Sequence, residues 1–503
     1  MMLKETIMEP TIYSRFKQLA NEAPEHPVII DEHSCVNRQG LDMMVDSLVS
    51  RFPSFIPARV GVVMDHCVEM IASLLAINKA GAAFVAVEPD YPPERLKRFL
   101  TESGVDFVIT QKEYASLVSE FTRLIVDHRL FDNPPLYALP DRGHGDRAAY
   151  ILYSSSPSGY PAGVMVGNRQ VLAMAERFGS IFKVTGDDVL LQYSACTVNI
   201  FIEEVFGTIL NGAILAIPSA KTRNNPQALM KFADEQYVSI ISGFPYLMQE
   251  LNSIPSLPMT LRLVISGGDS LNSASVEHLT EQLPVYNTYG PAVGTALSTV
   301  FCCNSGEPLP SGRYPIGKEC KGVDVMILDE NLEPVAVGEE GEICIAGNGV
   351  ADSFTGDHRA EQLSEITTLA DGTRIARTGD VGTRLPDGNL VYERRKDSEV
   401  NILGRRVVTG EVERAIIASG EVKECAVIHY TDEKGNAYLV AYVVPVSKSF
   451  SLSWLKNRAA QYLPSYMIPE FFVLLHHLPL TETGTLNPHA LPVVVKDVTA
   501  TAS

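Results

Sequence analysis

A stretch of small and hydroxyl-bearing residues at positions 154–163, SSSPSGYPAG, has the composition of a loop that holds phosphate groups. An apolar run precedes the stretch and another follows it. Backbone amides and hydroxyls in such a loop donate hydrogen bonds to phosphate oxygens. The stretch contains no Lys or Arg, so it offers hydrogen bonds without a positive charge. We predict phosphate contacts from Ser154, Ser155, Ser158 and Gly159.

Short apolar runs alternate with helical patterns before and after this loop, which is typical of a parallel sheet covered by helices. Apolar residues recur at helical spacing between positions 68 and 77 and predict a helix there. Pro92 and Pro93 open a second helix, because proline is tolerated in a first helical turn. A third helix begins at Pro245. The predicted strands are residues 59–64, 83–87, 106–109, 239–241 and 263–265.

The pattern changes after about residue 300. Short alternating runs at 323–328, 341–345 and 388–392 are separated by Gly and Asp turns, which predicts hairpins or a small barrel. A last α/β portion has a helix from Gly410, strands at 424–428 and 438–444, and a helix from about Ser451. The charged segment 393–397 is either a hinge between domains or a solvated turn.

These patterns predict an α/β fold class with two domains. Residues 1–396 form a large N-terminal domain of parallel sheets with helices plus a small β-barrel-like part. Residues 397–503 form a small α+β domain.

Bulk composition narrows the class of protein. The chain has 503 residues, 46% of them hydrophobic, and a formal net charge of −19. This length is too great for one core, so we expect about two or three domains. The charge argues against nucleic acid or an anionic membrane as partner, because both repel a polyanion. Solubility alone also explains the acidity.

Targeting and metal content are inferred from the N-terminus and the cysteines. The first residues, MMLKETIMEPTIYSRF, lack the apolar centre of a signal peptide. No run of about 18 apolar residues is present, so no membrane-spanning helix is predicted. The eight cysteines are scattered without a Cys-x-x-Cys pair. We expect a cytoplasmic protein with reduced, buried thiols and no metal site.

A series of punctuated segments runs along nearly the whole chain. It begins with residues 78–95, NKAGAAFVAVEPDYPPER, and continues with the loop at 154–163. The later segments are residues 287–291, 341–345, 377–380, 463–469 and 478–481. In this order the series resembles the adenylation domains of nonribosomal peptide synthetases, within the acyl-CoA synthetase and luciferase superfamily. One segment alone could arise by chance, but so many in this order could not reasonably do so.

The resemblance implies the adenylate-forming fold and its chemistry. In that family a substrate carboxylate attacks the α-phosphate of ATP and gives an acyl-adenylate and pyrophosphate. A carrier-protein thiol then usually takes the acyl group after the small C-terminal domain rotates, and Asp397 stands at the family's hinge position. The implied partner is a peptidyl or acyl carrier protein, or another synthetase component, in secondary-metabolite biosynthesis.

The resemblance also assigns a nucleoside-binding set that this chain retains. Asp380 stands where a carboxylate holds the ribose hydroxyls, Arg395 where an arginine assists it, and Tyr289 where a ring stacks on adenine. We therefore expect ATP or AMP to bind. The alternative is that these residues persist for packing, although surface Asp and Arg seldom carry a fold. The set is completed by Gly267, Gly268, Asp269, Asn287 and Gly290.

Positions that carry charge in the family hold uncharged residues here. Ala162 replaces the lysine of the phosphate loop, and Val293 replaces the glutamate that binds magnesium. Thr485 replaces the catalytic lysine of the C-terminal domain, and Leu403 replaces an arginine of the thiol-transfer segment. Losing one electrostatic donor to a transition state costs roughly 10²–10³ in rate, and losing several costs on the order of 10⁴ or more. We expect weak magnesium binding and impaired adenylation.

The acid-binding pocket implied by the resemblance departs from amino-acid activation. Members that use α-amino acids place an Asp where this chain has Asn199, which offers no ion pair to an ammonium group. Glu203 lies one helical turn further and can face the same cavity. The alternative is that both are ordinary polar helix residues around a collapsed pocket. The remaining predicted lining residues are Ile200, Ser242, Gly267, Thr288, Ala296 and Leu297.

Three functions stay open at this point. The favoured hypothesis is a pseudoenzyme or scaffold that keeps the adenylation fold and acts with a carrier protein or synthetase. The second is an active AMP-forming ligase for an unusual non-α-amino acid. The third is an acyl or amide transferase that receives a preactivated substrate.

Overall fold

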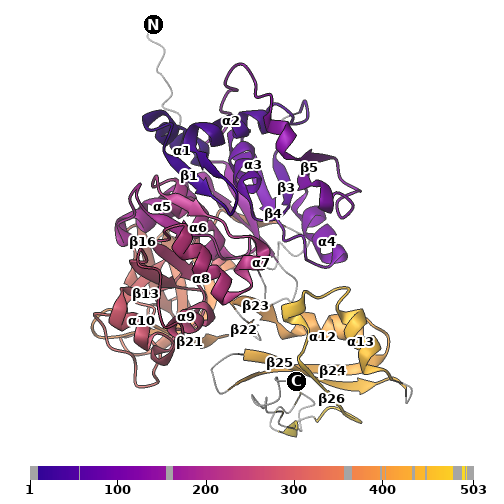
Figure 1. The fold of residues 1–503 in the computed structure, drawn as a ribbon. Coiled ribbons are helices and arrows are strands. Elements are labelled where there is room, and N and C mark those ends of the chain that lie inside the picture. Colours follow the sequence, from indigo (N-terminus) through magenta and orange to yellow (C-terminus); the bar gives the residue numbers. More distant parts are fainter. Residues whose placement is uncertain are drawn as a thin grey trace. The chain divides into compact units, whose positions relative to one another are not determined.

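The computed structural model describes residues 9–55, 57–154, 162–355, 365–396, 399–402, 404–432, 437–447 and 450–479, with 486, 490–492 and 494. They divide into two units (Figure 1). Unit 1 comprises the described residues of Met1–Pro89, Phe99–Ser154 and Ala162–Lys396, and unit 2 those of Asp90–Arg98 and Asp397–Ser503. Within these ranges, none of the helices has the length and apolar character needed to cross a membrane.

A nine-stranded sheet forms the centre of unit 1. Its strands from Val285–Tyr289 across to Pro27–Ile30 are parallel, and the strands beyond them at either edge pair antiparallel. Successive residues of one strand pack into different cores: Ile240 faces one core cluster and Ile241 the other. Both faces of these strands are therefore buried, which explains the uninterrupted apolar runs in the sequence. The strands, in sheet order, are β15 (Lys318–Glu319), β14 (Thr299–Cys302), β13 (Val285–Tyr289), β12 (Leu263–Ser266), β11 (Ile240–Gly243), β9 (Val189–Leu191), β10 (Ile214–Ala216), β1 (Pro27–Ile30) and β2 (Cys35–Asn37).

A seven-stranded sheet is the second layer of unit 1. Its strands β7, β4, β3, β5 and β6 are parallel, while β8 and β18 continue the sheet antiparallel. The strands, in sheet order, are β18 (Ser353–Thr355), β8 (Ala162–Gly167), β7 (Ala148–Ser154), β4 (Ala83–Ala86), β3 (Arg59–Val63), β5 (Phe107–Gln111) and β6 (Arg123–Val126).

Helices α5 (Asn168–Phe182) and α6 (Asn199–Ile209) lie between the two sheets. α5 packs on β7 and β8 of the seven-stranded sheet, α6 packs on β9, β10 and β11 of the nine-stranded sheet, and the two helices pack on each other. A Cβ at Gly207 would lie 2.8 Å from the ring of Phe178, so the glycine lets the helices approach closely. This packing fixes the position of α6, which carries Asn199 and Glu203.

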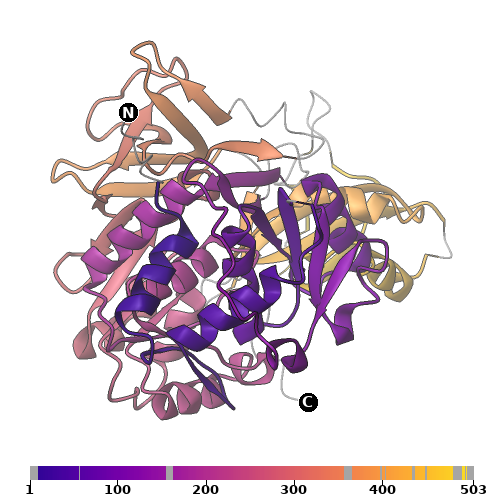
Figure 2. The ribbon, with the colours of Figure 1, turned by 90° about the horizontal axis from the view of Figure 1, so that it is seen from above.

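The other helices include α4, whose residues up to Arg98 belong to unit 2, and the N-terminal helices that Figure 2 shows in indigo. Three of them begin at predicted signals: α3 at Val68, α4 at Pro93 and α9 at Pro245. The helices are α1 (Ile12–Glu22), α2 (Arg38–Val49), α3 (Val68–Lys79), α4 (Pro93–Ser103), α7 (Ala220–Arg223), α8 (Pro226–Glu235), α9 (Pro245–Asn252) and α10 (Glu277–Gln282).

The predicted barrel-like part of unit 1 is an open sheet of five strands rather than a closed barrel. Its strands pair antiparallel. Residues 393–395 of the predicted hinge segment are the end of the paired strand β21, and the division between the two units falls after Lys396. The strands are β16 (Val323–Leu328), β17 (Glu340–Gly347), β20 (Arg374–Arg384), β19 (Ile366–Thr368) and β21 (Leu390–Arg395).

Unit 2 has a small α+β architecture of its own. β24 pairs antiparallel with β25, β25 pairs parallel with β26, and α12 packs against β24. A separate hairpin joins β22 to β23. The elements are β22 (Glu399–Ile402), β23 (Arg405–Val408), α12 (Thr409–Ile417), β24 (Val422–Thr431), β25 (Ala437–Pro445), α13 (Leu452–Ala459) and β26 (Phe471–Leu474).

Candidate functional site

Asp380 and Arg395 lie opposite each other on the paired strands β20 and β21. Nη1 of Arg395 donates to Oδ1 of Asp380 at 2.8 Å and to the carbonyl oxygen of Thr378 at 2.8 Å. The hydroxyl of Tyr289, at the end of β13, donates to Oδ2 of Asp380 at 2.6 Å. The Asp380 side chain is only 1% exposed. The structure therefore assembles the predicted ribose carboxylate, its arginine and the predicted adenine-stacking tyrosine into one hydrogen-bonded group.

Glu342 stabilises the turn that carries Asp380 through several hydrogen bonds. Its carboxylate accepts hydrogen bonds from Arg377 at 2.6 and 2.9 Å, from Lys396 at 3.1 Å and from the backbone nitrogen of Gly379 at 3.0 Å. The hydrogen bond with Glu342 raises the pKa of Arg377. The sequence motifs at 341–345 and 377–380 contain Glu342, Arg377 and Gly379, but no role was predicted for Glu342 from the sequence. The spacing of the two motifs along the chain could not show the role of Glu342, because the motifs meet only when β17 pairs with β20.

The predicted glycine turn beside adenine makes close backbone contacts. A Cβ at Gly267 would lie 2.7 Å from Oγ1 of Thr288. Gly268 has a φ of +77°, and a Cβ there would lie 2.8 Å from a neighbouring phenylalanine ring. Both positions therefore require glycine. Asp269 is exposed, and its Oδ1 accepts a hydrogen bond of 2.7 Å from the next backbone nitrogen.

Asn287 and Thr288 lie on β13, directly before Tyr289. Nδ2 of Asn287 donates to the carbonyl oxygen of Pro315 at 2.8 Å, whereas its Oδ1 is buried without a partner in the part of the chain that the structure describes. Oγ1 of Thr288 donates to the carbonyl oxygen of Ser266 at 3.1 Å. Thr288 thus ties β13 to the end of β12 beside the glycine turn.

The backbone after β13 folds back on itself. A Cβ at Gly290 would lie 2.3 Å from the backbone nitrogen of Leu297 and 2.4 Å from the carbonyl carbon of Ala296. Thr295, Ala296 and Leu297 have φ values of 50°, 54° and 25°, which residues with a Cβ seldom adopt. Three such residues in succession store backbone strain next to the predicted acid pocket, a place where strain commonly accompanies function.

Val293 stands where the resemblance places a magnesium-binding glutamate. It lies in the short 3₁₀ turn Ala292–Gly294 and is 7% exposed. Its side chain belongs to the large apolar core, and its carbonyl oxygen accepts a hydrogen bond from Ala351 at 2.9 Å. Magnesium requires oxygen ligands, which an apolar side chain in the core does not provide. The residue present does not fit a magnesium site.

Asn199 is the first residue of α6 and is tied to the folded-back loop. Its Nδ2 donates to the carbonyl oxygens of Gly290 at 3.1 Å and Pro291 at 3.3 Å. Its Oδ1 is buried and has no hydrogen-bond partner among the described residues. The amide therefore holds the loop with one end and leaves an acceptor for a ligand or water at the other.

Glu203 is buried one turn further along α6, with 5% exposure. Its Oε1 accepts a hydrogen bond from the backbone nitrogen of Leu297 at 3.1 Å. Burial raises the pKa of Glu203 to about 7. The guanidinium of Arg177 on α5 is also buried, but it forms no hydrogen bond with any described residue. Asn199, through Gly290 and Pro291, and Glu203, through Leu297, thus hold the folded-back loop against the N-terminal half of α6.

The remaining predicted pocket residues lie near the glycine turn or within the sheet. Cδ1 of Ile200 would lie 3.4 Å from a Cβ at Gly268 and 3.9 Å from one at Gly267. Ser242 is buried on β11, where its register partner on β12 is Ile265. Ile200 therefore joins the predicted acid pocket to the predicted adenine turn.

Several predicted residues lie outside the described part of the chain. The backbones of Ser154 and Ala162 pair at the ends of β7 and β8, on either side of the predicted phosphate loop. The residues outside the description are Ser155, Ser158, Gly159, Asp397, Leu403 and Thr485.

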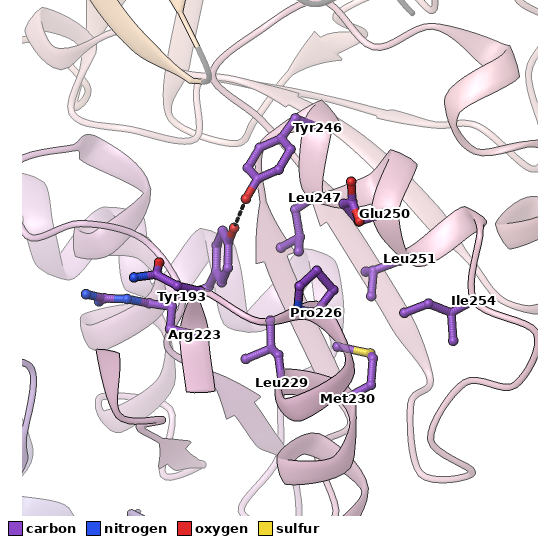
Figure 3. A pocket seen from close by; sticks show the side chains of 11 residues that line it. Tyr193, Arg223, Pro226, Leu229, Met230, Tyr246, Leu247, Glu250, Leu251 and Ile254 are labelled. Atoms are coloured by element: carbon purple, nitrogen blue, oxygen red, sulfur yellow. Dashed lines mark hydrogen bonds between the residues drawn. The ribbon is translucent and has the colours of Figure 1, made fainter. Parts of the chain in front are cut away.

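A cavity of about 120 Å³ in unit 1 was not predicted from the sequence (Figure 3). Tyr193 and Tyr246 meet at one side of it, with their hydroxyl oxygens 2.5 Å apart. Burial raises the pKa of Tyr193. The backbone nitrogen of Tyr193 donates to Glu204 on α6 at 3.1 Å, so the cavity adjoins the helix of the predicted acid pocket. Its other lining residues are mostly apolar: Arg223, Asn224, Pro226, Leu229, Met230, Leu247, Glu250, Leu251 and Ile254.

The cysteines form no disulfide. Four of them are buried, and burial raises the pKa of Cys344 to about 12, which keeps its thiol protonated and inert. Cys35 is exposed, so the expectation of buried thiols was wrong at that position. It lies on the short edge strand β2, where one side of the strand has no neighbour in the sheet.

Known proteins share both the sequence pattern and the fold. The sequence model described as AMP-binding enzyme matches residues 16–354, and the model described as AMP-binding enzyme C-terminal domain matches residues 411–485. Bacitracin synthase 2 of Bacillus licheniformis is 31% identical over 488 residues, which cover 96% of this chain. The match spans only 18% of that synthase.

Two solved structures show the same fold. One is NpsA-ThdA, an artificially fused adenylation-PCP di-domain from Klebsiella oxytoca, with a TM-score of 0.82 and 21% identity over 93% of this chain and 94% of that one. The other is o-succinylbenzoate CoA synthetase from Bacillus subtilis, with a TM-score of 0.83 and 19% identity over 95% of this chain and 98% of that one. At sequence identities of 21% and 19%, these two comparisons show a shared fold and do not by themselves show a shared function.

Proposed function

Because the chain belongs to the AMP-binding enzyme family, we propose that it is an adenylation-domain-like protein that keeps the nucleoside site but has lost most ATP-dependent adenylation. In this proposal it acts with a carrier protein or another synthetase component in the cytoplasm. The observation that carries the proposal is a contrast within unit 1. The predicted nucleoside residues form a complete polar group, whereas the predicted magnesium position holds a core valine.

The nucleoside side fits AMP or the nucleoside part of ATP. Asp380 and Arg395 would hold the ribose hydroxyls, and Tyr289 would lie along adenine. The close-packed turn at Gly267 and Gly268 lets backbone approach the base without a Cβ in between. The Asp380 side chain is 1% exposed and its ion pair with Arg395 keeps the buried carboxylate compensated.

The phosphate side lacks the groups that the chemistry uses. Charge develops on phosphate oxygens in the transition state, so fixed cations there are worth most. Ala162 and Val293 offer neither a cation nor a metal ligand, and Thr485 offers only a hydroxyl. A neutral hydrogen bond contributes about 1 kcal/mol, against roughly 1.5–3 kcal/mol for one to a charged group. Hydroxyls therefore cannot replace the missing charges.

A carrier-protein partner is supported by the relatives. NpsA-ThdA is an adenylation domain fused to a PCP domain, and bacitracin synthase 2 is much longer than this chain. We propose that this chain contacts a carrier protein or a synthetase of that kind.

Calorimetric titration with AMP and with ATP tests the nucleoside site. We expect both nucleotides to bind the intact chain with similar affinity, with or without magnesium, because the phosphate side adds little. Asp380→Asn should weaken AMP binding by about 10- to 100-fold, since a hydrogen bond to a charged group is lost. The exposed Asp371, whose Oδ1 accepts a hydrogen bond from Thr373 that Asn could also accept, gives the matched control Asp371→Asn.

Two outcomes of this titration would contradict the proposal. If neither AMP nor ATP gave a heat of binding, the proposal of a nucleoside site would be contradicted. Magnesium-dependent ATP binding that is far tighter than AMP binding would show that the phosphates are recognised after all. Thermal melts of each variant separate lost binding from lost folding.

A further inference from the structure

Three side chains that can ligate a metal meet at a buried point of unit 1. His66 follows β3, Glu88 follows β4, and Cys196 lies between β9 and α6. A ring nitrogen of His66, a carboxylate oxygen of Glu88 and the sulfur of Cys196 all lie within 4.8 Å of one another. The side chains of His66 and Glu88 are 4% and 8% exposed, and Cys196 is 1% exposed. Neither the nucleoside site nor the predicted acid pocket uses these residues.

The contacts around His66 fix the orientation of its ring. Nδ1 lies 2.6 Å from Oε1 of Gln192. The orientation of the Gln192 amide is set from its other end, because its nitrogen donates to the carbonyl oxygen of Ser194 at 2.7 Å and to Glu204 at 3.0 Å. An amide oxygen therefore faces Nδ1, and Nη1 of Arg223 also lies 2.9 Å from Nδ1, so Nε2 is the ring nitrogen left to face Glu88. A metal-binding histidine is commonly oriented in this way, by hydrogen bonding at its other ring nitrogen.

Nε2 of His66 lies 2.9 Å from Oε1 of Glu88. Either a proton on Nε2 or a metal ion can lie between these two atoms. A metal ion would also take the nearby sulfur of Cys196 as a third ligand.

We propose that His66, Glu88 and Cys196 bind one Zn²⁺ ion. Imidazole nitrogen, carboxylate oxygen and thiolate sulfur are the donors that zinc accepts, with water completing a tetrahedral set. The ion would join the ends of two strands of the seven-stranded sheet to the segment that enters α6 from the nine-stranded sheet. The backbone nitrogen of Cys196 already donates to Glu88 at 2.6 Å along the same connection. Because Asn199 is three residues after Cys196, the ion would help hold the start of α6.

Zinc titration of the intact chain, stripped of metal and competed against a chromophoric chelator, tests this site. We expect one tightly bound zinc per chain and a higher melting temperature with zinc present. Cys196→Ser and His66→Gln should each weaken zinc binding by at least about 10-fold. Cys303→Ser, at a buried cysteine outside the cluster, is the matched control and should bind as the wild type does.

Cobalt substitution keeps the proposal testable even if a variant fails to fold. Cobalt-loaded wild type should show the charge-transfer absorption of a cobalt-thiolate bond. Glu9, His144 and Asp146 form another cluster within 4.8 Å, but that cluster has no thiolate and cannot produce this absorption. Absence of the thiolate band, or unchanged zinc affinity in folded Cys196→Ser, would overturn the proposal and leave His66 and Glu88 as a pair that shares a proton. None of these readouts depends on nucleotide binding or on catalysis.

Discussion

Asp380 and Glu203 are both buried carboxylates, but their surroundings differ. Asp380 is held by Arg395 and Tyr289 and sits where the resemblance places a ribose ligand. The described residues give Glu203 one hydrogen bond, from a backbone nitrogen of the strained loop, and no ion pair. Burying a carboxylate with so few partners favours its neutral form. A group that changes charge near neutral pH therefore lies in the predicted acid pocket.

Stability should depend on pH through Glu203. Burial raises its folded pKa to about 7 from an ordinary value of 4.5, so the native state holds a proton that the unfolded chain releases. The favourable contribution is complete below the unfolded pKa and is lost as pH rises through the folded one. Melting temperatures between pH 5 and pH 8 should therefore fall less steeply for Glu203→Gln than for the wild type.

The exposed Glu330 provides the control for this comparison. Glu330→Gln should melt in parallel with the wild type across the same pH range. Parallel curves for wild type and Glu203→Gln would mean that Glu203 is ionised in the folded protein over this range. Burial also raises the pKa of Glu204 to about 7. Glu204 therefore contributes to the fall of melting temperature with pH in both the wild type and Glu203→Gln.

At the scale of elements, the sequence predicted most of the regular structure. The strands at β3, β4, β5, β11 and β12 follow from apolar runs, and α3, α4 and α9 begin at predicted positions. Periodicity works here because these strands are buried on both faces and the helices have a core-facing side. Residues 393–395 of the charged segment belong to β21, which forms a hairpin with the preceding strand β20, and their charged composition gave no sign of this pairing.

Sites assembled from distant segments were beyond sequence reasoning. His66, Glu88 and Cys196 belong to three connections that meet only when the two sheets pack through α5 and α6. The cavity at Tyr193 and Tyr246 has the same origin. The Asp380 group was predicted only because its residues lie in motifs that the resemblance supplied, since no spacing rule relates Tyr289 to Arg395.

The folded-back loop should be the most sensitive element of the predicted acid pocket. Gly290→Ala would put a methyl group 2.3 Å from the backbone nitrogen of Leu297, where only backbone can move. We expect a loss of about 1–3 kcal/mol in unfolding free energy, measured by urea denaturation. Gly186→Ala is the control, because its nearest neighbour at 3.3 Å is the movable ring of His26. Equal stability of the two variants would show that the loop at 290–297 is not closed as described.

At the scale of the whole molecule, fold and catalysis rest on different residues. The cores of unit 1 are apolar and do not require a charge at the family's phosphate-binding positions. Val293 even contributes to the large core. An adenylation fold can therefore persist after its phosphate chemistry weakens, which agrees with sequence matches that cover nearly the whole chain. The proposed nucleoside site and zinc site need only the fold.

ATP-pyrophosphate exchange by the intact chain tests the central claim most directly. Amino, aryl, hydroxy and keto acids would be assayed with magnesium, beside an active adenylation domain. With the family's charges replaced at positions 162, 293 and 485, we predict exchange on the order of 10⁴-fold or more below that reference for every acid. Rapid exchange with any one acid would contradict the account, because the chain would then supply the missing charges from residues that the resemblance does not identify.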